Sequence, residues 1–263
     1  MYKLGILGLG NMGGSILSGI IKSNLYNNDE IIIYDLDLSK TNKYLELGIS
    51  VANDINELLN NTEIILLAIK PQNINSLVLN CNNPNLNIIS IVAGKTINDL
   101  TLVFGDVNYI RVMPNTPSLI GEGTTVIAVD EKTDSNLLGE TIKIFNSIGL
   151  VETISDKLIN EVIPLNGSMP AYLYYFIKCF VNKAKTLGFS EEQAKILAAN
   201  SIIGSAQMVL KSNKDIDTLI KDVCSPGGAT LKGIEVLDNS NLQKIIDDVC
   251  EACIKRAYEL SSK

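Results

Sequence analysis

Gly8-Leu9-Gly10-Asn11-Met12-Gly13 follows the apolar segment Leu4–Leu7 and begins an amphipathic helical pattern. A Gly-x-Gly-x-x-Gly sequence is weak evidence alone, but between a strand and a helix it is the setting in which backbone amides hold a dinucleotide diphosphate. Gly8 permits the tight turn, Gly10 lets the backbone approach the diphosphate, and Gly13 lets the helix pack on the strand. The segment therefore predicts an N-terminal α/β domain that binds a dinucleotide. The helix N-terminus would add the amides of Asn11 and Met12.

An acidic residue follows the second predicted strand. Tyr34-Asp35 comes about twenty residues after the last glycine, where a carboxylate typically accepts hydrogen bonds from the adenosine ribose. Tyr34 and Asp35 are therefore predicted to contact the cofactor. NADH is favoured over NADPH, because Asp35 would repel a phosphate of like charge. In an alternative interpretation Asp35 caps the helix that begins near Ser39, and Asp37 competes for either role.

Composition excludes several classes of partner. The chain has 263 residues, 46% of them apolar, and its patterning changes near the middle, so two domains are expected. A net charge of −7 without a basic run argues against nucleic acid and anionic membranes. The apolar run Tyr172–Val181 is too short to span a bilayer. No secretory signal is expected, since Leu4–Leu7 runs directly into the glycines.

Cysteine and histidine counts bear on metals and catalysis. The odd number of scattered cysteines, five, favours a reducing cytoplasm over a disulfide framework. Cys250 and Cys253 lie three apart, but no histidine is present to complete a metal site, so we expect no metal. The absence of histidine also removes Ser-His and Cys-His nucleophilic mechanisms, which weakens a hydrolase interpretation.

Residues 1–157 are predicted to form a Rossmann-like α/β domain. Strands and helices alternate there, which predicts a parallel sheet with helices on both faces and ligands at the carboxyl ends of the strands. The predicted helices include Met12–Ser23 and Ser39–Leu47. The predicted strands are Leu4–Leu7, Ile31–Tyr34, Ile64–Ile69, Ile88–Val92, Tyr109–Met113 and Thr125–Val129.

Residues 158–263 are predicted to form an all-α domain. Its apolar side chains exceed what about a hundred residues can bury, which indicates dimerisation through this domain. Ser190-Glu191-Glu192-Gln193 has the pattern of a capping box. The predicted helices are Ala171–Leu187, the segment from this capping box to Lys211, Ala229–Leu237, and Asn241 to about Leu260.

A second anion site is predicted in the helical domain. Residues 222–230 read Asp-Val-Cys-Ser-Pro-Gly-Gly-Ala-Thr and place two hydroxyls and two glycines at the start of a helical pattern. Free amides and the helix dipole can hold a small carboxylate there. Ser225 could also be a plain helix cap, and the two roles are compatible.

Taken together, these motifs resemble the pyrroline-5-carboxylate reductase family, in matching order over nearly the whole chain. The resemblance implies reduction of 1-pyrroline-5-carboxylate to L-proline with NAD(P)H, the last step of proline biosynthesis. It also implies a homodimer with interleaved helical domains, often assembled into a decamer of five dimers. The motifs that carry it are Gly8–Gly13, Ala68-Ile69-Lys70-Pro71-Gln72, Ser90-Ile91-Val92-Ala93-Gly94, Arg111-Val112-Met113-Pro114-Asn115-Thr116-Pro117 and Val223-Cys224-Ser225-Pro226-Gly227-Gly228-Ala229-Thr230.

The resemblance also implies the roles of individual residues. Thr230 is the candidate catalytic residue, through a hydrogen bond to the ring nitrogen of the substrate. Asp156 stands where relatives can carry a substrate-contacting Glu. In an alternative interpretation Pro114–Pro117 is only a rigid loop. The cofactor residues implied are Ala68, Ile69, Lys70, Pro71, Ala93, Gly94, Asn115 at the nicotinamide end, and Asp222; those for the substrate, a cyclic imino acid, are Ser225, Gly228, Ala229 and Thr230.

The chain departs from the family pattern at three places. Asn166-Gly167-Ser168-Met169-Pro170-Ala171-Tyr172 stands where the family reads Ser-Gly-Ser-Gly-Pro-Ala-Tyr, so Met169 replaces a small residue near the inferred pocket. Ile55 stands where many members have an Asn near the adenosine, and the ribose-contacting turn is acidic.

Two other functions stay open: a β-hydroxyacid dehydrogenase and a non-catalytic dinucleotide-sensing protein.

Overall fold

The apolar strands pair into one eight-stranded sheet, in the order β3-β2-β1-β4-β5-β6-β7-β8. The computed structural model describes residues 1–77 and 79–261. Each predicted strand is confirmed, with ends shifted by up to two residues, whereas β3 and β8 were not predicted. The strands are β1 (Tyr2–Leu7), β2 (Ile31–Tyr34), β3 (Ser50–Val51), β4 (Thr62–Leu67), β5 (Asn87–Ser90), β6 (Asn108–Pro114), β7 (Gly123–Val129) and β8 (Gly149–Ser155).

The prediction of an all-parallel sheet is wrong for the last two strands. β7 runs antiparallel to β6, and β8 is parallel to β7. Only residues 115–122, including the short helix η4 (Thr116–Ile120), connect β6 to β7. A parallel crossover needs a dozen or more residues, so this connection forces an antiparallel pair. The helix α5 (Ser135–Asn146) then provides the longer crossover from β7 to β8.

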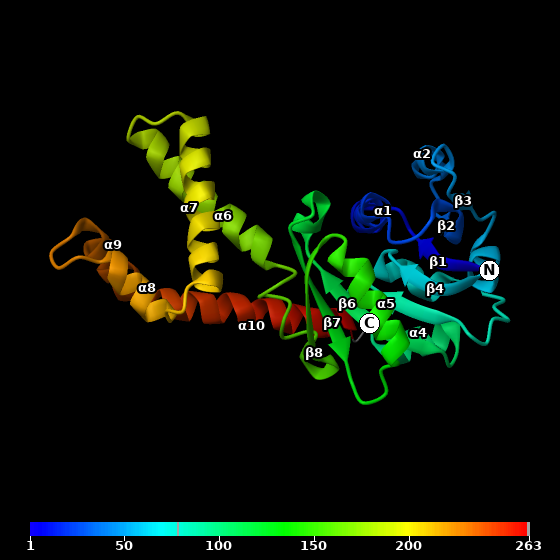
Figure 1. Cartoon of the computed structure of the whole chain (residues 1–263). Coiled ribbons are helices and arrows are strands. Elements are labelled where there is room, and N and C mark those ends of the chain that lie inside the picture. The colour runs from blue at the N-terminus through cyan, green and yellow to red at the C-terminus, as the bar shows by residue number, and fades with distance from the viewer. Residues whose placement is uncertain (78, 262–263) are drawn as a thin grey trace. The chain divides into compact units, whose positions relative to one another are not determined.

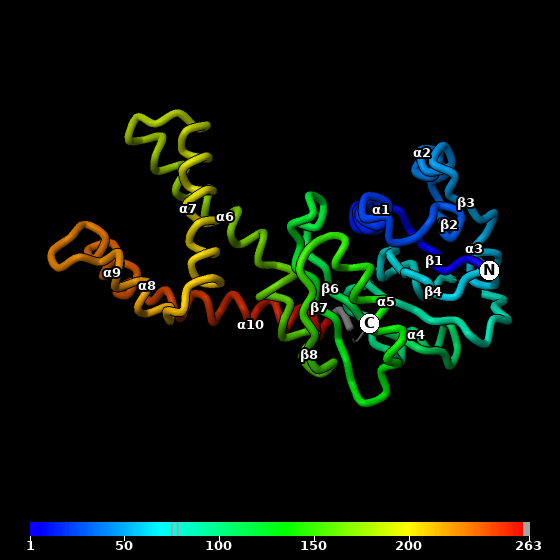
Figure 2. Tube along the Cα trace, in the orientation of Figure 1, coloured from blue at the N-terminus to red at the C-terminus, as the bar shows by residue number. Residues whose placement is uncertain are grey.

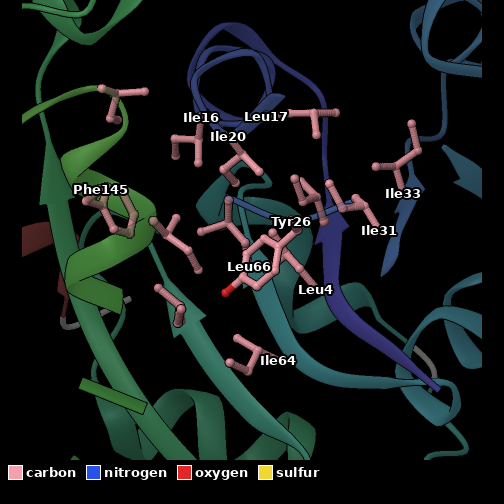
Figure 3. Packing of buried hydrophobic residues seen from close by; sticks show 14 of the residues in the cluster. Leu4, Ile16, Leu17, Ile20, Tyr26, Ile31, Ile33, Ile64, Leu66 and Phe145 are labelled. Carbon is pink, nitrogen blue, oxygen red and sulfur yellow. The ribbon is translucent and has the colours of Figure 1, made fainter. Parts of the chain in front are cut away.

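Helices bury both faces of the sheet, as the near-continuous apolar strands require. Helix α1 (Asn11–Ser23) packs Ile16, Leu17 and Ile20 against strand residues such as Leu4 and Leu66, and α5 contributes Phe145 to the same cluster (Figure 3). The helices α3 (Ile55–Asn60) and α4 (Ile97–Phe104) cover the opposite face. Figure 1 labels α4, which lies on the other side of the sheet from α1. The remaining short helices here are η1 (Asn28–Glu30), η2 (Leu38–Lys40), α2 (Asn42–Leu45), η3 (Pro71–Ser76) and η5 (Asp156–Leu158).

The chain divides into two compact units. Unit 1 contains Met1–Pro170 and the chain from Cys253 onward, and unit 2 is Ala171–Ala252. The predicted boundary between two domains after residue 157 stays a prediction. The division into compact units falls after Pro170 instead, and it returns the end of the chain to unit 1. There Tyr258 donates a hydrogen bond to Glu161, and the Ser168 hydroxyl lies 3.4 Å from the Cys253 sulfur. Figure 2 traces this last part of the chain in red.

Helices alone form unit 2. They are α6 (Met169–Thr186), α7 (Glu191–Lys211), α8 (Ile216–Val223), α9 (Ala229–Asn239) and α10 (Leu242–Ser261), of which α6 begins and α10 ends in unit 1. The predicted capping box is confirmed: Ser190 and Gln193 exchange hydrogen bonds of 3.2 and 3.1 Å between side chain and backbone. Helix α8 was not predicted. Over residues 1–77 and 79–261, we find no helix with the length and apolar character needed to cross a membrane.

An apolar groove of about 720 Å³ lies between α6 and α7. We call it the α6–α7 groove. It is entirely within unit 2, and its lining includes Leu173, Phe176, Phe180, Leu197, Ile202 and Val209. Leu197 is 58% exposed, and Phe180 is similarly exposed. Apolar surface of this extent on one chain indicates a surface that another protein covers.

Candidate active site

The glycine loop connects β1 to α1 in the geometry that the sequence predicts. Gly8 has a φ of 101°, and its N–H donates to the Tyr34 carbonyl at 2.8 Å. Gly10 is the N-cap of α1, and within the described chain no side chain caps this helix. A Cβ added at Gly10 would meet no atom within 4 Å, so there is space beside the loop. Free amides and this open space fit a diphosphate.

Residues at the carboxyl end of β4 lie against the same loop. The Ala68 amide donates to the Leu7 carbonyl at 2.8 Å. A Cβ on Gly8 would come within 2.7 Å of the Ala68 oxygen and 2.9 Å of the Ile69 side chain. Lys70 is the N-cap of η3, and Pro71 is its first residue. Ala68 to Pro71 thus follow the strand adjacent to β1, beside the glycine loop.

Asp35 supports the glycine loop directly. The residue is 9% exposed, and its Oδ2 accepts a hydrogen bond from the Leu9 amide at 2.6 Å. Its Oδ1 accepts from the Asp37 amide at 2.9 Å and from the Lys40 ammonium at 3.2 Å. Burial acts to raise the pKa of Asp35, but these hydrogen bonds and the lysine charge outweigh it and hold the pKa below its usual value. The carboxylate is therefore ionised near neutral pH.

The alternative in which Asp35 caps the following helix is wrong. Asp37 is the N-cap of η2, and its Oδ1 accepts hydrogen bonds from the Ser39 amide at 3.2 Å and the Ser39 hydroxyl at 2.6 Å. The two acidic residues thus have separate structural roles. The predicted helix Ser39–Leu47 is two short pieces, η2 and α2.

A cavity of about 360 Å³ lies at the carboxyl ends of β5 and β6, wholly within unit 1. It brings together three residues predicted for the cofactor, Met12, Ala93 and Gly94. Lys95 and Arg111 also line it, and neither was predicted from the sequence as a site residue. Lys95 is 8% exposed although it is charged. The sequence signal for Lys95 is its position directly after Ala93-Gly94, at the carboxyl end of a predicted strand.

Arg111 binds Asp156 with a two-point ion pair. Arg111 Nε lies 2.8 Å from Asp156 Oδ1, and Nη2 lies 2.6 Å from Oδ2. The Asp156 carboxylate, predicted to contact substrate, is thus engaged by a neighbour, and its substrate role stays a prediction.

Nearby, burial acts to raise the pKa of Asp99, but hydrogen bonds from Thr96 and the charges of Lys95 and Arg111 lower it below its usual value.

Asn115 fixes the loop after β6. Its side-chain oxygen accepts from the Thr124 amide at 2.9 Å, and its side-chain nitrogen donates to Asn166 Oδ1 at 3.2 Å. Asn166 is 4% exposed and donates in turn to the Met113 carbonyl at 2.7 Å. The predicted contact of Asn115 with nicotinamide stays a prediction. The chain's departure at Asn166 therefore has a structural role, because this side chain links the end of β6 to Asn115, the first residue of the loop that follows.

The residues predicted for the substrate, apart from Asp156, lie in unit 2. Helix α9 begins at Ala229 with Gly228 as N-cap and, in the part of the chain described, without a side-chain cap. The interpretation of Ser225 as a plain cap of α9 is therefore not supported; its carbonyl instead accepts from the Gly228 amide at 2.9 Å. Thr230 lies in the first turn of α9, whose free amides suit an anion. Asp222 forms an ion pair with Lys214 at 2.6 Å.

The fold and this site define a class of protein, the nicotinamide-dinucleotide oxidoreductases, with an added helical unit. Residues 3–94 match the family model for NADP oxidoreductase, coenzyme F420-dependent, and residues 156–260 match the model for pyrroline-5-carboxylate reductase dimerisation. The pyrroline-5-carboxylate reductase of Escherichia coli K12 is 31% identical over 98% of each chain. The chain belongs to the pyrroline-5-carboxylate reductase family.

Other relatives and solved structures support the same family assignment. The Pisum sativum pyrroline-5-carboxylate reductase is 30% identical over 99% of this chain and 96% of its own. The structure of Plasmodium falciparum pyrroline carboxylate reductase with NADP bound has a TM-score of 0.87 and 29% identity, and covers 99% of this chain and 98% of its own. The Coxiella burnetii pyrroline-5-carboxylate reductase has a TM-score of 0.88 and 28% identity, with the same coverage.

Proposed function

We infer that this chain reduces 1-pyrroline-5-carboxylate to L-proline with hydride from NADH or NADPH, the last step of proline biosynthesis. The observation that carries this inference is likeness to pyrroline-5-carboxylate reductases over 98% of both chains. Two local features support it: the uncapped start of α1 beside the glycine loop, and the uncapped start of α9. Each suits an anionic group, a diphosphate in unit 1 and a carboxylate in unit 2.

The chain's own residues supply binding and orientation. The amides at Gly10–Gly13 hold the diphosphate, and those at the start of α9 hold the substrate carboxylate. The Thr230 hydroxyl accepts a hydrogen bond from the protonated ring nitrogen. When bound, the nicotinamide would supply the hydride, which the carbon of the N-protonated imine accepts. This reaction needs orientation and exclusion of water more than a protein base, which suits a chain without histidine.

We propose that NADH is the favoured cofactor. The buried, ionised Asp35 can accept hydrogen bonds from the adenosine ribose, and hydrogen bonds to a charged group contribute about 1.5–3 kcal/mol. The same charge opposes a ribose phosphate. We expect kcat/KM to be at least roughly tenfold higher with NADH than with NADPH, since about 1.4 kcal/mol corresponds to one decade. Equal values, or a preference for NADPH, would remove Asp35 as the deciding charge.

We propose that the protein is a homodimer and that it works in the cytoplasm, and separate observations support the two proposals. The dimerisation family model over residues 156–260 and the α6–α7 groove support a homodimer through the helical region. A decamer of five dimers extends this proposal by family resemblance. All five cysteines are free, which suits a reducing cytoplasm. The acidic net charge of −7 disfavours nucleic acid and anionic membranes as partners.

The decisive test follows NADH and NADPH oxidation with 1-pyrroline-5-carboxylate, and NAD⁺ and NADP⁺ reduction with β-hydroxyacids. We expect turnover with 1-pyrroline-5-carboxylate and none with β-hydroxyacids in the reverse direction. Turnover of hydroxyacids alone would identify a β-hydroxyacid dehydrogenase. Cofactor binding by calorimetry without turnover of any substrate would instead identify a dinucleotide-sensing protein. Proline formation measured by chromatography checks that cofactor oxidation is coupled to the reduction.

Thr230→Ala should lower kcat/KM for the imine while leaving cofactor affinity and fold nearly intact. Loss of one hydrogen bond to a polar or charged substrate group costs about 1–3 kcal/mol, or roughly one to two decades in rate. Thr230→Ser is the matched control, because it keeps the hydroxyl and should retain most activity. If Thr230→Ala were as active as the wild type, Thr230 would not belong to the site.

A further inference from the structure

The Asp35–Lys40 ion pair lies directly after β2, where the adenosine ribose of a dinucleotide binds in this class of fold. We propose that Lys40 is a specificity-determining residue, which Asp35 positions and which binds the 2′-phosphate of NADPH. The inference rests on the proposed function, because it concerns the cofactor of that reaction. It assigns opposite preferences to two neighbouring side chains: Asp35 favours the ribose hydroxyl and Lys40 the phosphate.

One member of the pair is fixed and the other is free to move. Asp35 is buried, and its two oxygens accept hydrogen bonds from the amides of Leu9 and Asp37. The Lys40 side chain is 42% exposed, and its ammonium lies 3.2 and 3.5 Å from the two carboxylate oxygens. A phosphate entering this turn cannot displace the carboxylate, because doing so would break its hydrogen bonds to the loop. Lys40, on its long flexible stem, is the member that can adjust.

The ammonium retains capacity for a second anion. A lysine ammonium has three donors, and among the described residues the oxygens of Asp35 are the acceptors that Lys40 contacts. Placed between the carboxylate and a phosphate, the cation attracts both and reduces their mutual repulsion. Without it, a phosphate would face the ionised Asp35 alone. Lys40 should therefore contribute to NADPH affinity and contribute little to NADH affinity.

Lys43 provides a matched control. It lies three residues further along the chain, in α2, and its ammonium is 4.7 Å from the centre of the Tyr44 ring. Removing Lys43 changes the net charge of the chain by the same amount as removing Lys40. It leaves the contact with Asp35 intact. A general electrostatic effect would appear in both variants, whereas a specific phosphate contact would appear only at Lys40.

The test is calorimetric titration of the full-length protein with NADP⁺ and NAD⁺, which differ only in the 2′-phosphate. We expect Lys40→Gln to weaken NADP⁺ binding by about tenfold or more and NAD⁺ binding by less than about twofold. Lys40→Arg should keep most of the NADP⁺ affinity, and Lys43→Gln should change neither. The salt dependence of NADP⁺ binding should fall in Lys40→Gln, since one ionic contact is lost.

Equal weakening of both cofactors in Lys40→Gln would overturn the proposal, because the lysine would then only support the loop through Asp35. An unchanged NADP⁺ affinity would overturn it as well. Thermal unfolding of each variant, together with the arginine variant, separates misfolding from loss of the contact. Cofactor binding can be measured without imine turnover, so the proposed role of Lys40 and the proposed imine reduction can fail separately. A chain that shows the Lys40 effect but reduces no imine would refute only the proposed function.

Discussion

Gly13→Ala is expected to lower the affinity for NADH and NADPH together by about one to two decades. A Cβ at Gly13 would overlap the carbonyl oxygen of Gly8, well inside van der Waals contact, and would lie 3.1 Å from the Ala68 side chain. Backbone atoms cannot move aside as a flexible side chain can, so α1 would have to shift away from β1. The first-turn amides would then lose their position over the diphosphate.

Gly14→Ala is the control for this prediction. A Cβ at Gly14 would meet its nearest neighbours, the Tyr44 hydroxyl and the Leu9 carbonyl, at ordinary distances of 3.6 and 3.8 Å. Alanine is also favoured over glycine within a helix by roughly 0.5–1 kcal/mol. We therefore expect unchanged cofactor affinity and equal or higher thermal stability. Calorimetric titration of both variants checks the pair, and normal cofactor binding by Gly13→Ala would refute the assignment of the glycine loop.

Leu197→Glu is expected to dissociate the homodimer at micromolar concentration and to lower activity by at least about a hundredfold. Leu197 lines the α6–α7 groove and is exposed in the single chain, so glutamate there should not disturb the fold of one copy. In a dimer that covers the groove, the new carboxylate would be buried without a partner, at a cost of several kcal/mol. Activity should fall because unit 2 also carries the predicted substrate residues Ser225 and Thr230.

Gln207→Glu is the matched control, since it adds the same charge to the same helix. Gln207 is exposed and is not among the residues that line the groove. Sedimentation velocity and the imine reduction assay should give wild-type values for this variant. Should Leu197→Glu stay dimeric, the groove would not be the dimer interface, and another surface of the helical region would have to take that role.

Local patterns were sufficient to predict most of the fold. Runs such as Ile31–Tyr34 and Ile64–Leu67 have strand length and strand composition, and the capping box at Ser190 begins α7 as expected. The direction of β7 was predicted wrongly, because it depends on the length of the connection and not on the composition of the strand. The strand β3 covers only Ser50–Val51, which is too short to produce a periodic signal.

Much of the candidate site depends on contacts between distant parts of the chain. The glycine loop could be predicted because its residues are contiguous. Arg111 and Asp156 are separated by 45 residues, and Asn115 and Asn166 by 51, so no local pattern reveals either pair. Asp35 was predicted by its spacing, but its hydrogen bond to the Leu9 amide follows only from the pairing of β1 with β2. Motifs identify which residues belong to a site, and topology decides what each one touches.

Because the chain returns to unit 1 at Cys253, a single proteolytic cut should not separate the two units. Unit 2 is an insertion whose two ends are both anchored in unit 1. A single cut near Pro170 would leave the halves joined through α10, where Tyr258 and Cys253 contact Glu161 and Ser168. Limited digestion should therefore release unit 2 only after a second cut. A nicked intermediate should accumulate that migrates as fragments in denaturing gels but as an intact molecule under native conditions.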